Sequence, residues 1–192
     1  TEHSSISPEE AVESALQFEK DGATCIYMMA TANFMLEEYL EILQEVRGSV
    51  KKETILVGNV GDQSYENAKK LKDSGLTAVY HALRMREGVD TDIDPAQRKR
   101  SINNFMEAGL KVGNCVEPVG PEHTNEEIAD AIIFSGSFDA AFSGAARRID
   151  IPETEMAKTG MISELKMAQI VAVTRLGTPQ NIIGICTHEP CT

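Results

Sequence analysis

One carboxylate in this chain has surroundings that predict chemistry. Glu117 lies between the apolar pairs Cys115-Val116 and Pro118-Val119. A carboxylate flanked in this way is partly desolvated, which costs free energy unless a cation or an amine lies beside it. We therefore predict that Glu117 binds a positively charged group of a ligand.

Two adjacent arginines form a second candidate. Arg147 and Arg148 follow a predicted strand and the small residues Ser143-Gly144. A guanidinium presents a planar fork of N–H donors that fits a carboxylate. The pair is predicted to bind the carboxylate of a small-molecule substrate, and the alternative is a solvent-exposed position.

The densest group of potential metal ligands is Cys186-Thr187-His188-Glu189-Pro190-Cys191. Thiolates and an imidazole can hold zinc or an iron centre. However, this spacing matches no common structural zinc pattern, and two further ligands would have to come from elsewhere. A substrate-facing role for Cys186, Thr187 and His188 is therefore favoured over a metal site at Cys186, His188 and Cys191.

A repeated unit must position these residues. Six times an amphipathic stretch meets a glycine and a short apolar run follows, at Gly22, Gly48, Gly75, Gly109, Gly136 and Gly177. A glycine just past a helix can adopt the left-handed conformation that closes the last turn. A strand after every helix requires parallel strands with right-handed crossovers. The sequence predicts an α/β fold, a partial, open TIM-type β/α barrel with about six parallel strands in a single domain, residues 1–192.

The expected elements follow from capping signals and periodicity. Capping boxes at Ser7-Pro8-Glu9-Glu10 and Thr124-Asn125-Glu126-Glu127 begin two of the helices. The expected helices are Pro8–Asp21, Leu36–Val46, Ser64–Ser74, Pro95–Ala108, Thr124–Phe134 and Ser163–Leu176. The expected strands are Thr24–Met28, Thr54–Val57, Thr77–Tyr80, Lys111–Cys115, Phe138–Phe142 and Asn181–Ile185.

In such barrels, chemistry lies at the carboxyl ends of the strands. The residues that follow the strands are therefore candidates, and each has a purely structural alternative. Instead of contacting a ligand, Met29 could fill the core, because methionine packs adaptably. For His81 the alternative is a hydrogen-bonded position at a strand end with no ligand. For Arg84 and Glu87 the alternative is a solvated charge cluster at the surface, where ion pairs are weak.

Composition excludes several function classes. The formal charge of -12, from 18 Lys and Arg against 30 Asp and Glu, disfavours nucleic acid. The chain has no apolar run of roughly 20 residues and no signal peptide at its amino terminus, so we expect a cytoplasmic protein with no membrane partner. The four cysteines are expected to be thiols.

The order of these segments resembles the biotin synthase-like branch of the radical S-adenosylmethionine enzymes, which includes a hydrogenase maturase and methylornithine synthase. Ser7-Pro8-Glu9-Glu10 is similar to the helix start after the family's cluster loop. Asp21-Gly22-Ala23-Thr24 into Met28-Met29-Ala30 resembles a strand that contacts the methionine part of the cofactor. Ala108-Gly109-Leu110-Lys111-Val112 into Val119-Gly120-Pro121-Glu122 resembles a strand and glycine-rich loop near the adenine, and Ser163 to Arg175 resembles the penultimate helix.

The resemblance implies an enzyme that reductively cleaves S-adenosylmethionine to a 5'-deoxyadenosyl radical, which removes hydrogen from a small-molecule substrate in a biosynthetic or cofactor-assembly pathway. It also implies an electron donor such as ferredoxin or flavodoxin. The residues implied to bind the cofactor are Met29, Ala30, Thr31, His81, Arg84, Glu87, Asn114 and Glu117.

The cluster ligands are the main departure from the family. The family that this chain resembles holds its [4Fe-4S] cluster with three cysteines spaced roughly C-x-x-x-C-x-x-C, and no such triplet occurs here. We therefore expect a chain that lacks the first strand with its cluster loop and the carboxyl-terminal end, is inactive alone, and binds a cluster only with that loop. An open barrel exposes strand edges, which favours a homo-oligomer.

The residues bear on two other functions. A Schiff-base lyase or aldolase needs a lysine at the carboxyl end of a strand, but Lys111 begins its strand. A cluster-free β/α-barrel module that binds a small molecule or acts as a scaffold stays open as the alternative.

Overall fold

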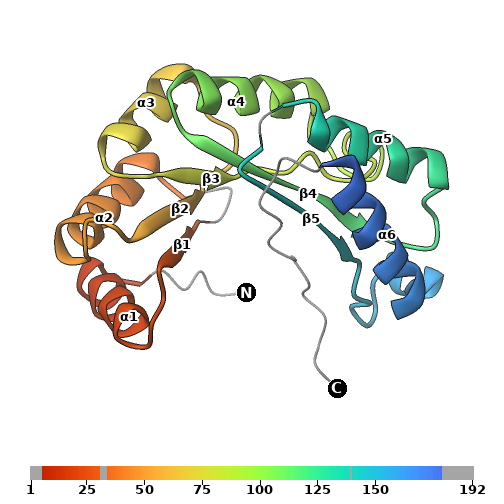
Figure 1. Ribbon diagram of the computed structural model, residues 1–192, viewed down its shortest axis with the longest axis horizontal. Helices are drawn as coiled ribbons and strands as arrows, with labels where there is room; N and C mark the ends of the chain where they lie inside the picture. Colours follow the sequence, from red (N-terminus) through yellow and green to blue (C-terminus); the bar gives the residue numbers. More distant parts are fainter. Residues whose placement is uncertain (1–5, 31–33, 139, 179–192) are drawn as a thin grey trace. The chain divides into compact units, whose positions relative to one another are not determined.

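The computed structural model describes residues 6–30, 34–138 and 140–178. Helices and strands alternate along the chain, as predicted (Figure 1). The helices are α1 (Pro8–Lys20), α2 (Leu36–Ser49), α3 (Tyr65–Asp73), α4 (Pro95–Glu107), α5 (Asn125–Gly136) and α6 (Glu164–Gly177), with a 3-10 helix η1 (Glu155–Thr159). The strands are β1 (Cys25–Met29), β2 (Ile55–Asn59), β3 (Ala78–Tyr80), β4 (Lys111–Val119) and β5 (Phe142–Arg147).

The strand pairing confirms the predicted fold class. The described strands form a sheet in the order β1-β2-β3-β4-β5, and the registered pairs β1–β2, β2–β3 and β4–β5 are parallel. The predicted strand Asn181–Ile185 lies outside the described residues. The carboxyl ends of neighbouring parallel strands lie at the same edge of a sheet, which is the edge where the candidate residues were predicted.

The chain divides into two compact units, which are described separately. The first comprises Thr1–Tyr80 with Arg100–Lys111, and the second comprises His81–Lys99 with Val112–Thr192. The expectation of a single domain stays a prediction.

In the first unit, helices α1, α2 and α3 cover one side of β1, β2 and β3 (Figure 1). Both predicted helix starts with capping boxes are confirmed, and the one in this unit begins α1. The Ser7 hydroxyl accepts a hydrogen bond from Glu10 N, while the Glu10 carboxylate accepts one from Ser7 N. Leu43, Leu56 and Leu71 are fully buried in the core of this unit.

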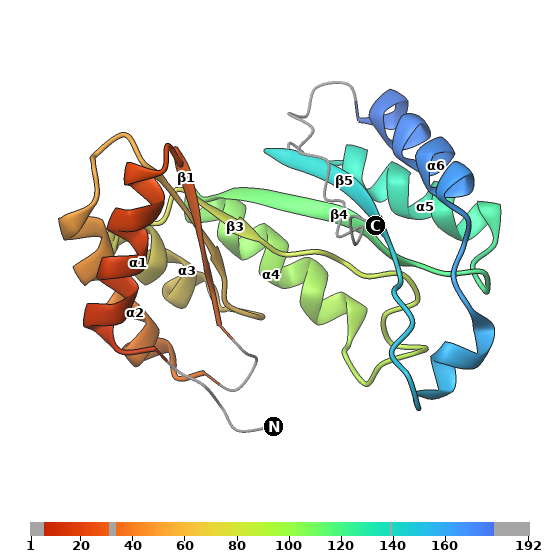
Figure 2. The same cartoon turned by 90° about the horizontal axis from the view of Figure 1, so that it is seen from below.

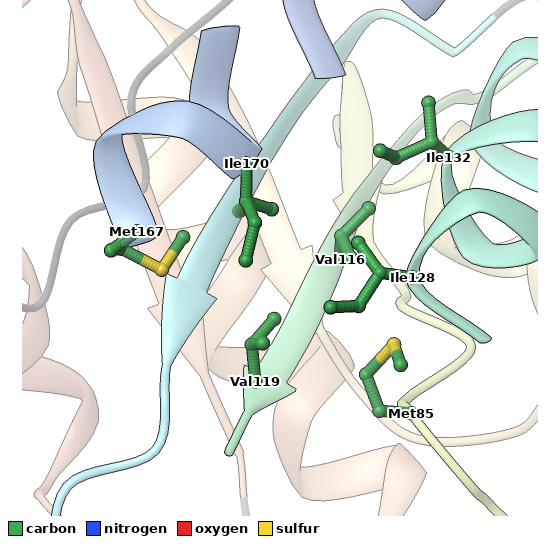
Figure 3. Packing of buried hydrophobic residues seen from close by; sticks show 8 residues of the cluster. Met85, Val116, Val119, Ile128, Ile132, Met167 and Ile170 are labelled. Atoms are coloured by element: carbon green, nitrogen blue, oxygen red, sulfur yellow. The ribbon is translucent and has the colours of Figure 1, made fainter. Parts of the chain in front are cut away.

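In the second unit, α5 and α6 lie side by side, as Figures 1 and 2 both show. Their apolar side chains pack with residues of β4 and β5 into one cluster (Figure 3). The cluster comprises Met85, Val116, Val119, Ile128, Ile132, Ala145, Met167 and Ile170. Val116 and Val119 therefore mark the helix-covered face of β4.

The prediction for the fifth strand was wrong. Residues Phe138–Phe142 were expected to form it, but β5 begins only at Phe142 and runs to Arg147. The register pairs Phe142 with Gly113, where a Cβ would collide with the phenyl ring. The strand is built from the small residues Ser143-Gly144-Ala145-Ala146, which have weak β propensity and gave no apolar signal.

The glycine pattern was correct at only some positions. Gly22, Gly75 and Gly109 have positive φ and follow helix ends, as predicted. Gly48, Gly136 and Gly177 instead lie inside α2, α5 and α6. They are the last or next-to-last helical residues, so those helices end without a left-handed glycine.

Among the described residues, no helix combines the length and apolar character needed to cross a membrane.

Candidate functional site

Within the second unit, the segment after β3 brings two predicted residues together around an arginine. His81 is buried, and its backbone N–H donates to Gly113 O at 2.9 Å. Arg98 of α4 places Nη1 3.3 Å from His81 Nε2, and its Nη2 lies 3.5 Å from Glu87 Oε1. Arg98 Nη1 also lies 3.5 Å from His81 Nδ1, so the guanidinium is close to both ring nitrogens.

The buried Glu87 also fixes the turn in which it lies. Its Oε2 accepts a hydrogen bond of 3.1 Å from Arg84 N. This bond holds the backbone of Arg84 in place, while the Arg84 side chain is exposed. Glu87 therefore has a definite structural role, and its predicted contact with a cofactor stays a prediction.

Asn114 lies on the helix-covered face of β4, since it is two residues from Val116. Its Oδ1 accepts from Leu83 N at 2.9 Å, and its Nδ2 donates to Ser135 Oγ on α5. The side chain is almost completely buried. The amide thus joins the segment after β3 to α5, and its predicted role in cofactor binding stays a prediction.

Glu117 lies in β4 between Val116 and Val119, where the pairing with β5 shifts in register. It is half-buried, and among the described residues its carboxylate has no hydrogen-bond or ion-pair partner. Its backbone carbonyl accepts a 2.7 Å hydrogen bond from Met85 N. Arg84 precedes Met85, so an exposed guanidinium and a half-buried carboxylate belong to adjacent chain segments.

The loop after β4 contains an ion pair that the sequence reasoning did not identify. Arg148 Nη2 lies 2.8 Å from Glu122 Oε2, with both side chains largely buried. Arg148 also donates to the carbonyls of Met156 and Gly160. Burial acts to raise the pKa of Glu122, but hydrogen bonds from its own backbone N–H and from Arg148, together with the Arg148 charge, hold it below its ordinary value.

Arg147 and Arg148 are therefore not alike. Arg148 binds a carboxylate of its own chain and lies at the end of β5 without being exposed. Arg147 donates from Nη1 to Ile162 O at 3.1 Å. The prediction that they bind a substrate carboxylate stays a prediction.

His123, in the same loop, has a buried side chain that nothing in the sequence pattern indicated. Its Nδ1 accepts from Gly120 N at 2.9 Å, and its side chain is 2% exposed. No hydrogen-bond partner of its buried Nε2 is found in the described part of the chain. The pattern Gly-x-x-His offered no signal, because the contact depends on how the loop folds.

In the first unit, Met29 ends β1 with 73% of its surface exposed. Ala30 N donates to Asn59 O at 2.9 Å, which places it beside the end of β2. Thr31 lies outside the described residues, as do Cys186, Thr187, His188 and Cys191.

The described cysteines are Cys25, which is exposed, and Cys115, which is buried. Within the described ranges no group of three His, Cys, Asp or Glu side chains could hold a metal ion. The described residues therefore do not fit an iron-sulfur cluster.

Comparison with known proteins relates the fold to one group of enzymes. No protein-family model matches the sequence, and no curated protein matches it significantly. Among solved structures, methylornithine synthase (PylB) has a TM-score of 0.80 at 15% identity over 94% of this chain and 55% of its own.

HydG, a maturase of the [FeFe]-hydrogenase, has a TM-score of 0.79 at 17% identity over 97% of this chain and 46% of its own. HydG from Carboxydothermus hydrogenoformans has a TM-score of 0.77 at 18% identity over 97% of this chain and 47% of its own. The chain thus spans about half the length of these structures. They are members of the family that the sequence resembles, so the resemblance is supported at the level of the fold.

Proposed function

We propose that this chain is the core of a radical S-adenosylmethionine enzyme of the biotin synthase-like branch, and that its second unit binds the amino-acid part of that cofactor. The observation that carries the proposal is the half-buried carboxylate of Glu117, which has no partner among the described residues. A carboxylate gains short, charge-assisted hydrogen bonds from a cation that lies beside it. The α-ammonium of S-adenosylmethionine is such a cation.

Arg84 completes the proposed recognition. Its guanidinium is exposed and belongs to the segment that is hydrogen-bonded to Glu117 through Met85 N. A zwitterionic amino acid carries one ammonium and one carboxylate, so Glu117 and Arg84 offer the two complementary charges. When bound, the cofactor supplies the 5'-deoxyadenosyl group that in this family removes hydrogen from a substrate.

The 192 residues contain no cysteine triplet of the family's spacing, so they do not fit the [4Fe-4S] cluster. For the whole protein, we propose that it cleaves the cofactor, acts on a small-molecule substrate and takes its electron from a donor protein.

The test is calorimetric titration of the chain with S-adenosylmethionine and with 5'-methylthioadenosine, which lacks the amino-acid part. Glu117→Gln is expected to weaken S-adenosylmethionine binding by about tenfold, the scale of one charge-assisted contact. Binding of 5'-methylthioadenosine should not change. Glu107→Gln, at an exposed position of α4, serves as the matched control.

Absence of S-adenosylmethionine binding to a folded chain would contradict the proposal. If Glu117→Gln weakened the binding of both ligands equally, that would also contradict the proposal, since Glu117 would then not recognise the amino-acid part of S-adenosylmethionine. The alternative function is a cluster-free β/α-barrel module that binds a small molecule or acts as a scaffold. It predicts tight binding of a different small molecule and none of S-adenosylmethionine.

A further inference from the structure

A groove runs along the helix layer of the first unit, between α1 and α2. It has a volume of about 850 Å³ and is lined by residues of these two helices alone, with no strand residue among them. None of the candidate site residues is among those that line it. On α1 the lining residues extend from Pro8 to Lys20, which corresponds to a length of roughly 18 Å at the helical rise.

The walls of the groove are acidic. Four carboxylates and one ammonium line it, namely Glu9, Glu13, Glu41, Glu45 and Lys20. Their side chains are spread along the two helices, and they do not converge on a point where a metal ion could be held among the described residues. The pKa of Glu9 is lowered by hydrogen bonds from its own backbone N–H and from Ser7, so this carboxylate stays ionised.

The floor of the groove is apolar. Pro8, Val12 and Leu16 lie four residues apart along α1, so they form one line on the helix surface. Leu16 keeps 44% of its surface exposed. An apolar line between two acidic walls is the complement of a helix that has apolar residues on one face and basic residues at its sides.

We propose that the α1–α2 groove binds a basic amphipathic helix of another polypeptide segment. The occupant inserts apolar side chains against Val12 and Leu16, and its Lys or Arg side chains face Glu13 and Glu45. The net charge of the lining is opposite to that of such a helix, which favours this occupant over an acidic protein or a nucleic acid. The groove length matches a helix of roughly 12 residues.

The test uses fluorescence anisotropy with a labelled lysine–leucine amphipathic peptide of roughly 12 residues. Its control is the same peptide with every leucine replaced by serine. Glu45→Lys is expected to weaken peptide binding by about tenfold, because an attraction becomes a repulsion. Glu107→Lys makes the same charge change at an exposed position of α4 and should have little effect. Leu16→Ser should weaken binding several-fold, and circular dichroism of each variant confirms that it is folded.

Two results would overturn the proposal. If Glu45→Lys and Glu107→Lys weaken binding equally, the peptide responds to the overall charge of the protein and not to this groove. If the serine-substituted peptide binds as tightly as the leucine peptide, the apolar floor has no part in recognition. Neither readout depends on S-adenosylmethionine, so this proposal and the proposed function can fail independently.

Discussion

Arg148 Nη2 donates a 2.8 Å hydrogen bond to Glu122 Oε2, joining the end of β5 to the loop after β4. The same guanidinium binds the carbonyls of Met156 and Gly160. One arginine therefore fixes both the loop after β4 and the segment around η1.

Arg148→Met is expected to destabilise the fold by about 2 kcal/mol, since it removes several hydrogen bonds to a charged group and leaves a largely buried carboxylate unpaired. Urea unfolding followed by circular dichroism measures the change. Arg84→Met is the matched control, because that side chain is exposed, and its effect should stay within about 0.5 kcal/mol. Equal losses in the two variants would show that the Arg148 contacts contribute no stability.

The lowered pKa of Glu122 predicts a pH dependence. A carboxyl group whose pKa is lower in the folded state stabilises the fold above its unfolded value, ordinarily 4.5, and the contribution is lost as the pH falls through the folded pKa. The stability difference between wild type and Glu122→Gln should therefore be largest near neutral pH and shrink below about pH 4.5.

Urea unfolding of both proteins across this pH range measures the difference. Glu155→Gln is the control, because the ion pair of Glu155 with Lys158 is exposed. A wild-type advantage over Glu122→Gln that stays constant from neutral to acidic pH would contradict the prediction.

Gly113→Ala tests the register of β4 and β5. An added Cβ would overlap three carbon atoms of the Phe142 ring, so the ring or the strand must move. Overpacking of this kind is expected to destabilise the fold by about 1–3 kcal/mol. Thermal unfolding measures the change, and the double variant Gly113→Ala with Phe142→Ala should recover part of the loss.

The control for this substitution is Gly48→Ala in α2, where nothing lies within 4 Å of the added Cβ. That change should raise stability by about 0.5–1 kcal/mol, because alanine favours the helical backbone. A Gly113→Ala protein as stable as wild type would mean that Phe142 does not occupy the space opposite Gly113.

The features that could be predicted from the sequence are local ones. The capping boxes at Ser7 and Thr124 depend on residues three positions apart, and both occur as predicted. Helix periodicity and the alternation of helix and strand were likewise sufficient for the fold class. β5 could not be placed, because its small residues favour a strand only when paired with β4.

The site was predictable only in part. The rule that chemistry lies at strand ends made His81, Glu87 and Glu117 candidates, and their roles stay predictions. It could not identify Arg98 as the partner of His81, because these residues are 17 positions apart and meet only when α4 packs. Nor could spacing reveal that Asn114 faces α5, since that depends on which face of β4 the helices cover.

Met85 connects two different environments. Its amide is bonded to the carbonyl of Glu117, while its side chain belongs to the apolar cluster beneath α5 and α6. A displacement of the main chain at Glu117 would therefore also displace Met85, whose side chain packs in the cluster that contains Ile128. The main chain at Glu117 is thus joined through one hydrogen bond to a side chain in the interior of the second unit.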